Sequence, residues 1–533
     1  MIIFNDRYAI LVLIPFCVAM SIVLRAESSG PQSVDIFNDE IPLQWELYDD
    51  GCRVIGENGH RLLEVVTTDV FSDNWAMADL NAFDGFEGKA LRVRGEIRCE
   101  QLARENSTYR WAGAKLVVVQ ESTNGERESS TLAKYGTTQW EPVEEIFFLD
   151  PGSELTVMIG IEGASGSAWF RNFNLALIDA TDVYPAAGSN ITQAAYSESV
   201  ESMPHRRGFM SPSTFTEAFF GKDMPEMKRW GANLLRLQLI RNWNQADSDQ
   251  SVEEYLLWVR QRVPDILRVL DLADELDMQV VLDLHVPPGG RRRPGGEMNL
   301  FHEKKFAEAF LDAWKVLATS VAGHPALYGY DLLNEPYQKV VPADEVDYLE
   351  LQYRAAQMVR EIDKETPIII ESNLNASPKT FRYLKPLPLE DIIYQVHMYE
   401  PALYTHQGVG GNPLLEAAYP GTLPAGFYEK NEYFDRRKLK EVLQPVRDFQ
   451  LKYGAKIYVG EFSTARWSKG GERYLEDCIS IFEEYGWDWS YHAFREWDGW
   501  SLEHADEKED RKRSESDTDR KKVLLQALER NSQ

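Results

Sequence analysis

The stretch from Leu327 to Gln338 reads "LYGYDLLNEPYQ", an apolar run that ends in an amide, a carboxylate and a proline. Pro336 has no backbone N–H and cannot continue a strand ladder. The residue before a proline favours an extended backbone, so Glu335 is predicted to be extended. A strand that served only for packing would have no use for Asn334 and Glu335 at its end. We therefore expect this strand end to border a functional site.

A short apolar run followed by a helical pattern recurs along the second half of the chain. The runs are "RGFM" (207–210), "NLLRLQL" (233–239), "QVVLDLH" (279–285), "LYGYDLLNE" (327–335), "IIIES" (368–372), "IIYQVHMYE" (392–400), "KIYVGEFS" (456–463) and "DWSYHAFREW" (488–497). Eight strands, each followed by a helix, predict a (β/α)8 TIM barrel over residues 205–533. An open doubly wound sheet is the alternative. It would more often carry a Gly-rich phosphate turn after its first strand, which this sequence lacks.

Residues 30–180 have a different rhythm, with a period of two. In "ALRVRGEIRC" (90–99), apolar and charged residues alternate, and turn residues separate this run from further runs of the same kind. The pattern predicts an all-β sandwich domain that resembles the jelly-roll modules attached to many polysaccharide-degrading enzymes. Trp75, Trp111 and Trp140 are candidates for a sugar platform, with core packing as the alternative for each. Residues 181–204 are rich in small and polar residues and are predicted to be a linker.

The N-terminus and the overall charge bear on where the protein works. Ala9 to Leu24 is a near-continuous apolar run, short for a membrane span, so residues 1–26 are predicted to be a signal peptide cleaved after Ala26. An uncleaved anchor is the alternative, and no other segment is long enough to span a membrane. We expect an exported protein. A formal net charge of -28 over 533 residues disfavours nucleic acid and anionic membranes as partners.

The cysteines leave one question open. Cys17 lies in the predicted signal peptide, and Cys478 lies in a helical pattern typical of a buried thiol. Cys52 and Cys99 are able to form a disulfide in an oxidising compartment, but their spacing does not decide this. No Cys/His cluster has the spacing of a zinc site, so neither a metal nor another cofactor is predicted.

Polar or large aromatic side chains gather at the predicted C-terminal ends of six barrel strands, where enzymes of this fold hold their catalytic groups. These residues are Arg236, Asp283, His285, Asn334, Glu335, His397, Tyr399, Glu461 and Trp497. Each has a purely structural reading when taken alone, such as a strand-end ion pair or a buried histidine. Their convergence on one end of the barrel favours an active site. Two glutamates on different strands are what glycoside hydrolysis requires.

The motifs around these residues resemble those of glycoside hydrolase family 5, the cellulase family, over about residues 205–533. Asn334-Glu335-Pro336 resembles the acid/base signature of that family, and Gly460-Glu461-Phe462 resembles its nucleophile signature. The "HMYEP" stretch (397–401) resembles the strand-six segment, and all eight positions that typify the family have a counterpart here. The first strand lacks the Gly-Asn-Trp stretch that is common in the family.

The resemblance implies a retaining double displacement with Glu461 as nucleophile and Glu335 as acid/base, their carboxyl groups about 5–5.5 Å apart. It also implies that Asn334 binds the sugar 2-hydroxyl and that His285 binds a neighbouring hydroxyl. His397 would orient Glu335. We expect the charge of Glu461 and partial burial to raise the pKa of Glu335, and neighbouring donors to favour ionised Glu461.

Two further features sit beside this pattern. Trp497 would form a floor under the sugar, and His406, in "YTHQGVG" (404–410), is a candidate contact at the rim of the cleft. The loop "VPPGGRRRPGGEMN" (286–299) would lie over the cleft, either as a substrate clamp or as an insert without that role.

The sequence thus predicts an exported enzyme that hydrolyses a β-linked polysaccharide, with an endo-β-1,4-glucanase as the leading interpretation. The same mechanism acting on mannan, β-1,3-glucan or xylan is the alternative. A catalytically silent carbohydrate-binding protein is a hypothesis of a different class, and the intact pair of Glu335 and Glu461 argues against it. The sequence does not indicate an oligomeric state.

Overall fold

A computed structural model gives the structure of the protein. It describes residues 33–35, 46–47, 51–57, 60–68, 74–79, 89–104, 112–122, 125–131, 133–149, 154–179, 205–241, 251–291, 297–338, 347–382, 384–425 and 431–532. The predicted signal peptide, the predicted linker and Trp111 lie outside these residues. Among the described residues, every helix is too short or too polar to span a lipid bilayer.

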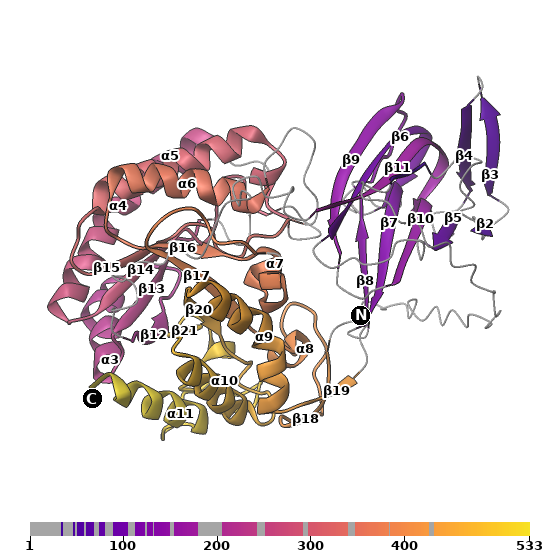
Figure 1. Cartoon of the computed structure of the whole chain (residues 1–533). Coiled ribbons are helices and arrows are strands. Elements are labelled where there is room, and N and C mark those ends of the chain that lie inside the picture. The colour runs from indigo at the N-terminus through magenta and orange to yellow at the C-terminus, as the bar shows by residue number, and fades with distance from the viewer. Residues whose placement is uncertain are drawn as a thin grey trace.

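The second half of the chain forms the predicted barrel. Eight parallel strands close on themselves in chain order: β12 (Arg207–Met210), β13 (Leu234–Gln238), β14 (Gln279–Asp283), β15 (Leu327–Asp331), β16 (Ile368–Glu371), β17 (Ile392–Met398), β20 (Lys456–Phe462) and β21 (Asp488–Tyr491). Helices surround the strands in Figure 1. The main ones are α3 (Met224–Arg229), α4 (Val252–Glu275), α5 (Lys304–Val321), α6 (Tyr348–Ile362), α9 (Arg436–Tyr453), α10 (Gly471–Tyr485) and α11 (Asp519–Leu528). The prediction of a (β/α)8 fold is confirmed.

Shorter elements decorate the loops of the barrel. They are η2 (Phe219–Asp223), η4 (Asn299–Phe301), α7 (Asn373–Ala376), η5 (Pro378–Arg382), α8 (Ala402–Thr405), the antiparallel pair β18 (Gly421–Pro424) and β19 (Asn431–Phe434), η6 (Asp498–Trp500) and η7 (Glu529–Ser532). The loops after β17 and β21 carry α8 and η6, and both carry residues of the predicted site.

Two apolar layers hold the barrel together. Inside it, one cluster of fully buried side chains comes from six strands: Leu234, Val281, Tyr328, Ile369, Ile393 and Tyr458. Between the strands and the helices lies a much larger cluster, to which α5 contributes Phe310 and Trp314. Burial of apolar surface contributes roughly 25 cal/mol per Å², so this outer layer is the main source of stability. The helices bury one face each because their apolar residues recur at helical spacing.

The strands of the barrel end earlier than the sequence predicts. β15 stops at Asp331, so Asn334 and Glu335 lie in the segment that follows the strand. The prediction of an extended backbone at Glu335 is wrong, because its φ is +50°. This left-handed conformation costs a non-glycine residue of order 1–3 kcal/mol and persists only where neighbouring groups hold it. The bias imposed by Pro336 is therefore overridden by contacts at the barrel mouth.

The N-terminal half forms two antiparallel sheets. One has the order β3 (Cys52–Glu57), β4 (His60–Thr67), β11 (Ala164–Asp179), β6 (Lys89–Arg104) and β9 (Glu141–Phe148), with β1 (Ser33–Asp35) beside β11. The other has the order β2 (Glu46–Leu47), β5 (Asn74–Asp79), β10 (Glu154–Glu162), β7 (Gly113–Ser122) and β8 (Gly125–Ser130). The strands β4, β11, β6 and β9 of the first sheet face β5, β10, β7 and β8 of the second. This strand order is that of a jelly roll. The predicted sandwich is confirmed.

One apolar core joins the two sheets and explains the alternating sequence. Leu91, Val93 and Ile97 from β6 pack with Leu116 from β7 and Val157 from β10, and all are fully buried. Successive residues of a strand point to opposite faces, so every second residue enters this core.

The sandwich places two of the cysteines and two of the tryptophans considered in the sequence. Cys52 and Cys99 are both buried and are not bonded to each other, so the disulfide left open by their spacing does not form. They lie on β3 and β6, which β4 and β11 separate, and this distance is too great for a disulfide. Trp75 lies on β5, whereas Trp140 directly precedes β9 of the other sheet, with Arg98 and Arg171 stacked against its ring. Sugar binding by the sandwich stays a prediction.

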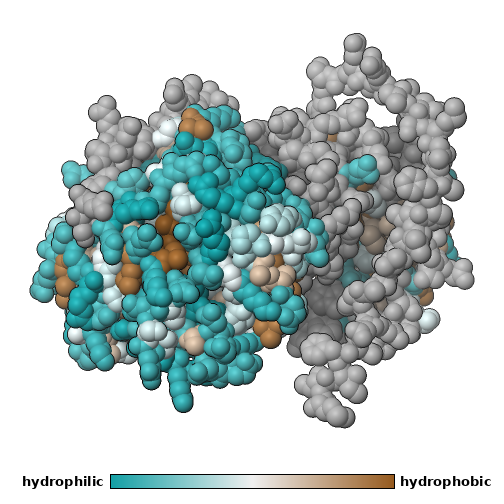
Figure 2. Space-filling model, turned by 90° about the horizontal axis from the view of Figure 1, so that it is seen from below, coloured by the Kyte–Doolittle hydropathy of each residue, from teal (hydrophilic) through white to brown (hydrophobic). Residues whose placement is uncertain are grey.

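The surface agrees with the acidic composition. Figure 2 shows one face of the molecule, on which the barrel is mostly hydrophilic and its apolar residues form small separate patches. Cys478 is buried in α10 as predicted, and burial raises the pKa of its thiol.

Candidate active site

One arginine organises the mouth of the barrel. Arg236, the third residue of β13, is completely buried. Its guanidinium donates hydrogen bonds to Glu461 Oε1 at 2.6 Å, to Asn334 Oδ1 at 2.9 Å and to Asp331 Oδ2 at 2.8 Å. It also lies 3.0 Å from a carboxylate oxygen of Glu371 and 3.2 Å from one of Asp283. A single cation therefore serves four buried carboxyl groups from the strands β14, β15, β16 and β20.

Glu461 is held inside its strand. It lies in β20, is almost completely buried, and accepts a hydrogen bond of 2.9 Å at Oε2 from the Tyr399 hydroxyl. His492 Nδ1 lies 3.5 Å from the same oxygen. Burial alone would raise the pKa of this carboxyl, but His397, His492 and Arg236 outweigh burial and hold the pKa well below its usual range. The expected ionised state of Glu461 agrees with this environment.

Glu335 has a different set of neighbours. Its Oε1 lies 3.1 Å from His397 Nδ1, and its Oε2 lies 3.6 Å from Arg291 Nη2. Burial and the charge of Glu461 raise the pKa of Glu335, as expected. A hydrogen bond donated by His397, together with the charges of His397 and Arg291, lowers the pKa below its usual value. The expected upward shift is therefore wrong for the arrangement in which His397 donates to Glu335.

Arg291 gives the long loop after β14 a place beside the acid/base candidate. Its guanidinium donates to the backbone carbonyl of Glu335 at 2.9 Å and to that of Asn334 at 3.4 Å. The first described part of the loop, residues 286–291, thus contacts the Asn334-Glu335 turn itself.

Glu335 and Glu461 approach each other closely. One oxygen of Glu335, one oxygen of Glu461 and one nitrogen of His397 all lie within 4.8 Å of one another. Carboxyl groups of retaining glycosidases lie about 5–5.5 Å apart and those of inverting enzymes about 6.5–9.5 Å apart, because inversion needs room for a water. The closest oxygens of Glu335 and Glu461 lie no farther apart than 4.8 Å, which is nearer to the first of these separations than to the second.

A chain of polar contacts runs along the opposite wall. Asp283 Oδ2 lies 2.8 Å from His285 Nδ1, and His285 Nε2 lies 3.3 Å from Asn334 Nδ2. Asp283 orients the histidine ring, and the ring in turn meets the amide that Arg236 also binds. All of these side chains are more than nine-tenths buried, which fixes the face that a ligand would meet.

The aromatic residues line the rim. Trp497 is 38% exposed, and its ring meets Trp467 and Trp500 edge-on, with centroids 5.9 and 5.2 Å apart. A partly exposed indole at the barrel mouth is a suitable surface for an apolar sugar face. His406 packs edge-on against Tyr399, and burial lowers its pKa to about 4. Neutral His406 thus supports the Tyr399 ring.

The structure brings the predicted residues together and adds several that sequence reasoning missed. The missed residues are Arg291, Asp331, Glu371, Gln395 and His492. Asp331, Glu371 and Gln395 lie in predicted strands at positions that point into the barrel, and this parity was the available signal. His492 follows β21 and lies 2.6 Å from the Tyr399 hydroxyl.

Gly460 has a role other than the one its position suggests. A glycine directly before Glu461 suggests that it leaves space beside that carboxyl group. A Cβ at Gly460 would instead lie 2.4 Å from the side chain of Gln395. The glycine therefore makes room for a buried amide of the neighbouring strand β17.

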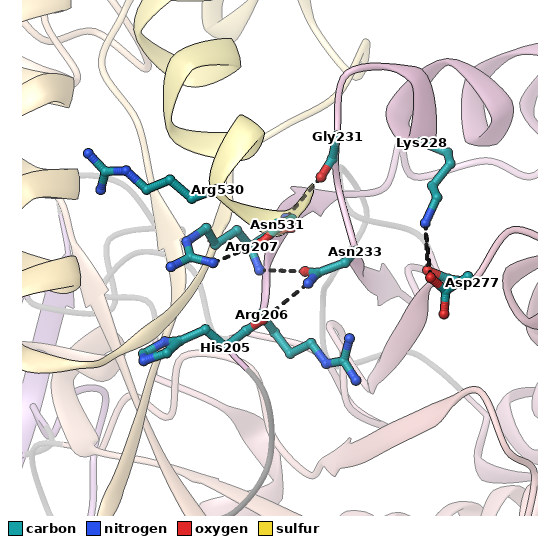
Figure 3. A pocket seen from close by; sticks show the side chains of 9 residues that line it. All are labelled: His205, Arg206, Arg207, Lys228, Gly231, Asn233, Asp277, Arg530 and Asn531. Carbon is teal, nitrogen blue, oxygen red and sulfur yellow. Dashed lines mark hydrogen bonds and ion pairs between the residues drawn. The ribbon is translucent and has the colours of Figure 1, made fainter. Parts of the chain in front are cut away.

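A cavity lies at the opposite end of the barrel. It measures about 320 Å³ and is lined by His205, Arg206, Arg207, Lys228, Gly231, Asn233, Asp277, Arg530 and Asn531. Figure 3 shows its lining, in which Lys228 faces Asp277 and Arg207 faces Asn531. Most of these residues lie just before or at the start of the first three barrel strands, Lys228 lies in α3, and Arg530 and Asn531 lie in η7. The cavity therefore belongs to the floor of the barrel and has neither Glu335 nor Glu461 in its lining.

Comparison with known proteins agrees with the geometry. The family model described as "Cellulase (glycosyl hydrolase family 5)" matches residues 202–498, more than half of the chain. The chain belongs to glycosyl hydrolase family 5. As a member of this family it is a glycosidase that hydrolyses O-glycosyl bonds, and the resemblance noted in the sequence is confirmed.

Curated proteins that this chain resembles carry different names. Endoglucanase C of Acetivibrio thermocellus is 27% identical over 293 residues, covering 51% of this chain and 83% of that protein. Beta-xylosidase of Phanerodontia chrysosporium is 25% identical over 300 residues, covering 53% of this chain and 58% of that protein. The solved structure of Thermotoga maritima Cel5A with cellobiose is 20% identical, with a TM-score of 0.43, and covers 61% of this chain and 97% of that one.

Proposed function

We propose that the protein is a retaining endo-β-1,4-glucanase, with Glu461 as nucleophile and Glu335 as acid/base. The observation that carries this proposal is the approach of the two carboxyl groups, whose oxygens lie within 4.8 Å of each other. The different surroundings of the two groups support the division of roles. Glu461 is bound by Arg236 and Tyr399, which favour a carboxylate, whereas Glu335 has His397 as a partner that can exchange protons.

In the first step, an oxygen of Glu461 attacks the anomeric carbon of the sugar. The bond from that carbon to the leaving oxygen breaks, and Glu335 gives its proton to the leaving oxygen. In the second step, ionised Glu335 takes a proton from water, and the water oxygen displaces Glu461 from the sugar. Each cycle consumes one water and restores both carboxyl groups. Asn334 binds the 2-hydroxyl of the sugar, and Trp497 supports its apolar face.

The choice of β-1,4-glucan rests on relatives rather than on the catalytic pair. The relative with 27% identity is named an endoglucanase, and this name supports glucan as substrate. Another relative is named a xylosidase, so mannan, β-1,3-glucan and xylan belong in the same test. We also propose that residues 205–533 form the catalytic domain, that residues 30–180 form a separate module and that the protein is exported.

Reducing-sugar release from β-1,4-glucan, mannan, β-1,3-glucan and xylan tests the proposal. The wild type is expected to release sugar fastest from β-1,4-glucan, with the anomeric configuration retained in the first product. Glu335→Gln and Glu461→Gln are expected to be inactive on every polymer. Inverted product would contradict the double displacement, and faster release from another polymer would reassign the substrate.

A further inference from the structure

A buried carboxyl group links both catalytic glutamates from behind. Glu371 is the last residue of β16 and is completely buried. Its Oε2 accepts a hydrogen bond of 2.7 Å from the backbone N–H of Glu335. Its Oε1 accepts one of 3.0 Å from Arg236, which also binds Glu461. Glu371 itself lies behind the reacting groups, so it would act through them.

The contact to the Glu335 backbone has a clear purpose. Glu335 has a φ of +50°, which a side chain other than glycine adopts only where its surroundings hold it. Its N–H points away from any strand ladder and needs an acceptor when buried. Glu371 supplies that acceptor, and Arg291 holds the carbonyl of the same residue. The peptide units on both sides of Glu335 are thereby anchored, and with them the direction of its carboxyl group.

A second buried side chain connects Glu371 to His397. The amide nitrogen of Gln395, Nε2, donates a hydrogen bond to Glu371 Oε1 and lies 3.1 Å from His397 Nε2. The other nitrogen of His397, Nδ1, faces Glu335. The proton on Glu371 therefore decides which end of the amide faces it. The structure has the amide nitrogen in this place, which suits an ionised Glu371, and it leaves the buried Gln395 Oε1 without a hydrogen bond to any described residue. With the amide turned over, a protonated Glu371 donates to Gln395 Oε1, and that oxygen also accepts from His397 Nε2–H.

The charges around Glu371 favour the protonated form. Burial and the nearby carboxylates of Asp331 and Asp283 hold the pKa of Glu371 well above its usual range, against the opposing charge of Arg236. The ionisable groups that face it are Arg236 from β13, Asp283 from β14, Asp331 from β15, His397 from β17 and Arg291 from the loop after β14. With His397 protonated at Nε2, its Nδ1 lone pair accepts a hydrogen bond from the protonated carboxyl group of Glu335, and Glu335 keeps the proton that a general acid gives to the leaving oxygen.

We propose that Glu371 and Gln395 are positioning residues for the acid/base step: Glu371 anchors the backbone of Glu335, and Gln395 sets the tautomer of His397. This inference rests on the proposed role of Glu335. It predicts that the two residues matter when the leaving group needs a proton and matter little when it does not.

Two aryl cellobiosides separate these cases. Dinitrophenolate leaves without a proton, whereas phenolate needs one. The ratio of kcat/KM for phenyl β-cellobioside to kcat/KM for 2,4-dinitrophenyl β-cellobioside therefore reports the acid step. Glu371→Leu is expected to lower kcat/KM for the phenyl substrate by roughly 10²-fold, within the range for general acid catalysis, and to leave the dinitrophenyl substrate within about threefold. Glu371→Gln keeps an oxygen that can accept from the Glu335 N–H, so its kcat/KM for the phenyl substrate is expected to fall less than that of Glu371→Leu.

A second variant and a control complete the test. Gln395→Met removes the acceptor of His397 Nε2–H and is expected to move the basic limb of the kcat/KM profile to lower pH, even if Glu371→Leu does not fold. Asp363→Asn removes a buried carboxyl group that binds Tyr330 far from the mouth, and its substrate ratio is expected to stay that of the wild type.

The outcomes distinguish the inference from the proposed function. If Glu371→Leu lowered kcat/KM equally for both aryl substrates, or for neither, the positioning role would be overturned. The proposed function would still stand in that case, because the wild type would be active. An unmoved pH profile in Gln395→Met would overturn the role of Gln395. A wild type that hydrolyses neither substrate would overturn the proposed function itself, and this inference with it.

Discussion

The two ends of the barrel both carry buried charges, but they balance them differently. At the floor, Asp488 begins β21 and accepts from the backbone N–H of Arg206 at 2.9 Å, from Lys456 at 2.9 Å and from the Tyr328 hydroxyl. One carboxylate there has one close ammonium group and several donors. At the mouth, one guanidinium group, that of Arg236, is shared among four carboxyl groups.

This difference separates what stabilises the barrel from what it is used for. A buried carboxylate with a full set of partners is a stable element, and removing one partner costs several kcal/mol. A cluster with an excess of negative charge costs stability and shifts pKa values, which is typical of active sites. Substitutions of buried charges at the floor are therefore expected to lower mainly the free energy of unfolding. Substitutions of buried charges at the mouth are expected to lower mainly the activity.

The largest effect is expected from Glu461→Gln. Loss of the nucleophile should lower kcat by roughly 10⁵-fold or more, because the covalent step has no substitute group. The low pKa of Glu461 means that its carboxylate contributes to stability at neutral pH, so urea unfolding should show a small loss of free energy, limited because Arg236 keeps three other carboxyl partners. Substantial remaining activity would contradict the role of Glu461, and a marked loss of stability would erase the contrast between the two ends.

The second effect concerns the floor. Asp488→Asn leaves Lys456 buried without its carboxylate and is expected to lower the free energy of unfolding by about 3–5 kcal/mol. Activity at temperatures below the transition should stay within about twofold of the wild type. The double variant Asp488→Asn with Lys456→Met is the matched control and should recover part of the stability. A loss of activity in a stable Asp488→Asn protein would contradict the division of roles.

The same contrast explains what the sequence could predict. The strands, their order and the residues of the mouth follow from short-range patterns, because apolar runs and helical spacing are local signals. The floor and the mouth look alike at this level: Asp488 and Glu371 are both carboxylates at a strand end. Only the three-dimensional neighbours show that one is balanced and the other is not.

The parts that the sequence missed depend on contacts between distant segments. The backbone of Glu335 is set by Glu371 and Arg291, 36 and 44 positions away, against the local bias of Pro336. The pKa of Glu335 depends on the proton position in His397, which no motif encodes. Gly460 is next to Glu461 in the sequence, yet it makes room for Gln395 from another strand, a contact that the sequence does not reveal.

The third effect is a pH dependence at the mouth. Burial, with a contribution from Asp283, raises the pKa of Asp331 to about 6, against the charge of Arg236. The folded protein then binds this proton more tightly than the unfolded chain, so stability falls as the pH rises from about 4 to about 6. The loss from this group is at most roughly 3 kcal/mol, from a shift of about two units.

Asp331→Asn removes this titration. Urea unfolding at pH 4.5 and pH 7 should show a smaller loss of stability on raising the pH in the variant than in the wild type. The floor supplies the comparison, because Lys456 and its other partners keep the pKa of Asp488 below its usual value despite burial. Asp488→Asn should not reduce the loss seen in the wild type. Equal pH dependence in wild type and Asp331→Asn would contradict the proton on Asp331.

The smallest effect sharpens the electrostatics of the mouth itself. Arg291 lies 3.6 Å from Glu335 Oε2, and its charge lowers the pKa of that carboxyl. Arg291→Ala should therefore keep Glu335 protonated to higher pH and move the basic limb of the kcat/KM profile upward by less than about one unit, since each unit corresponds to about 1.4 kcal/mol.

Arg291→Lys keeps the charge but loses the paired hydrogen bonds to the carbonyls of Asn334 and Glu335, so it separates electrostatics from anchoring. The basic limb of the kcat/KM profile should stay in place in Arg291→Lys, because the charge remains. If the Asn334-Glu335 turn loosens, kcat should fall in both Arg291→Lys and Arg291→Ala. A basic limb that moves equally in both variants would assign the effect to the geometry of the Asn334-Glu335 turn. A limb that moves downward in Arg291→Ala would contradict the sign of the charge effect and would mean that Arg291 acts on Glu335 only through its backbone.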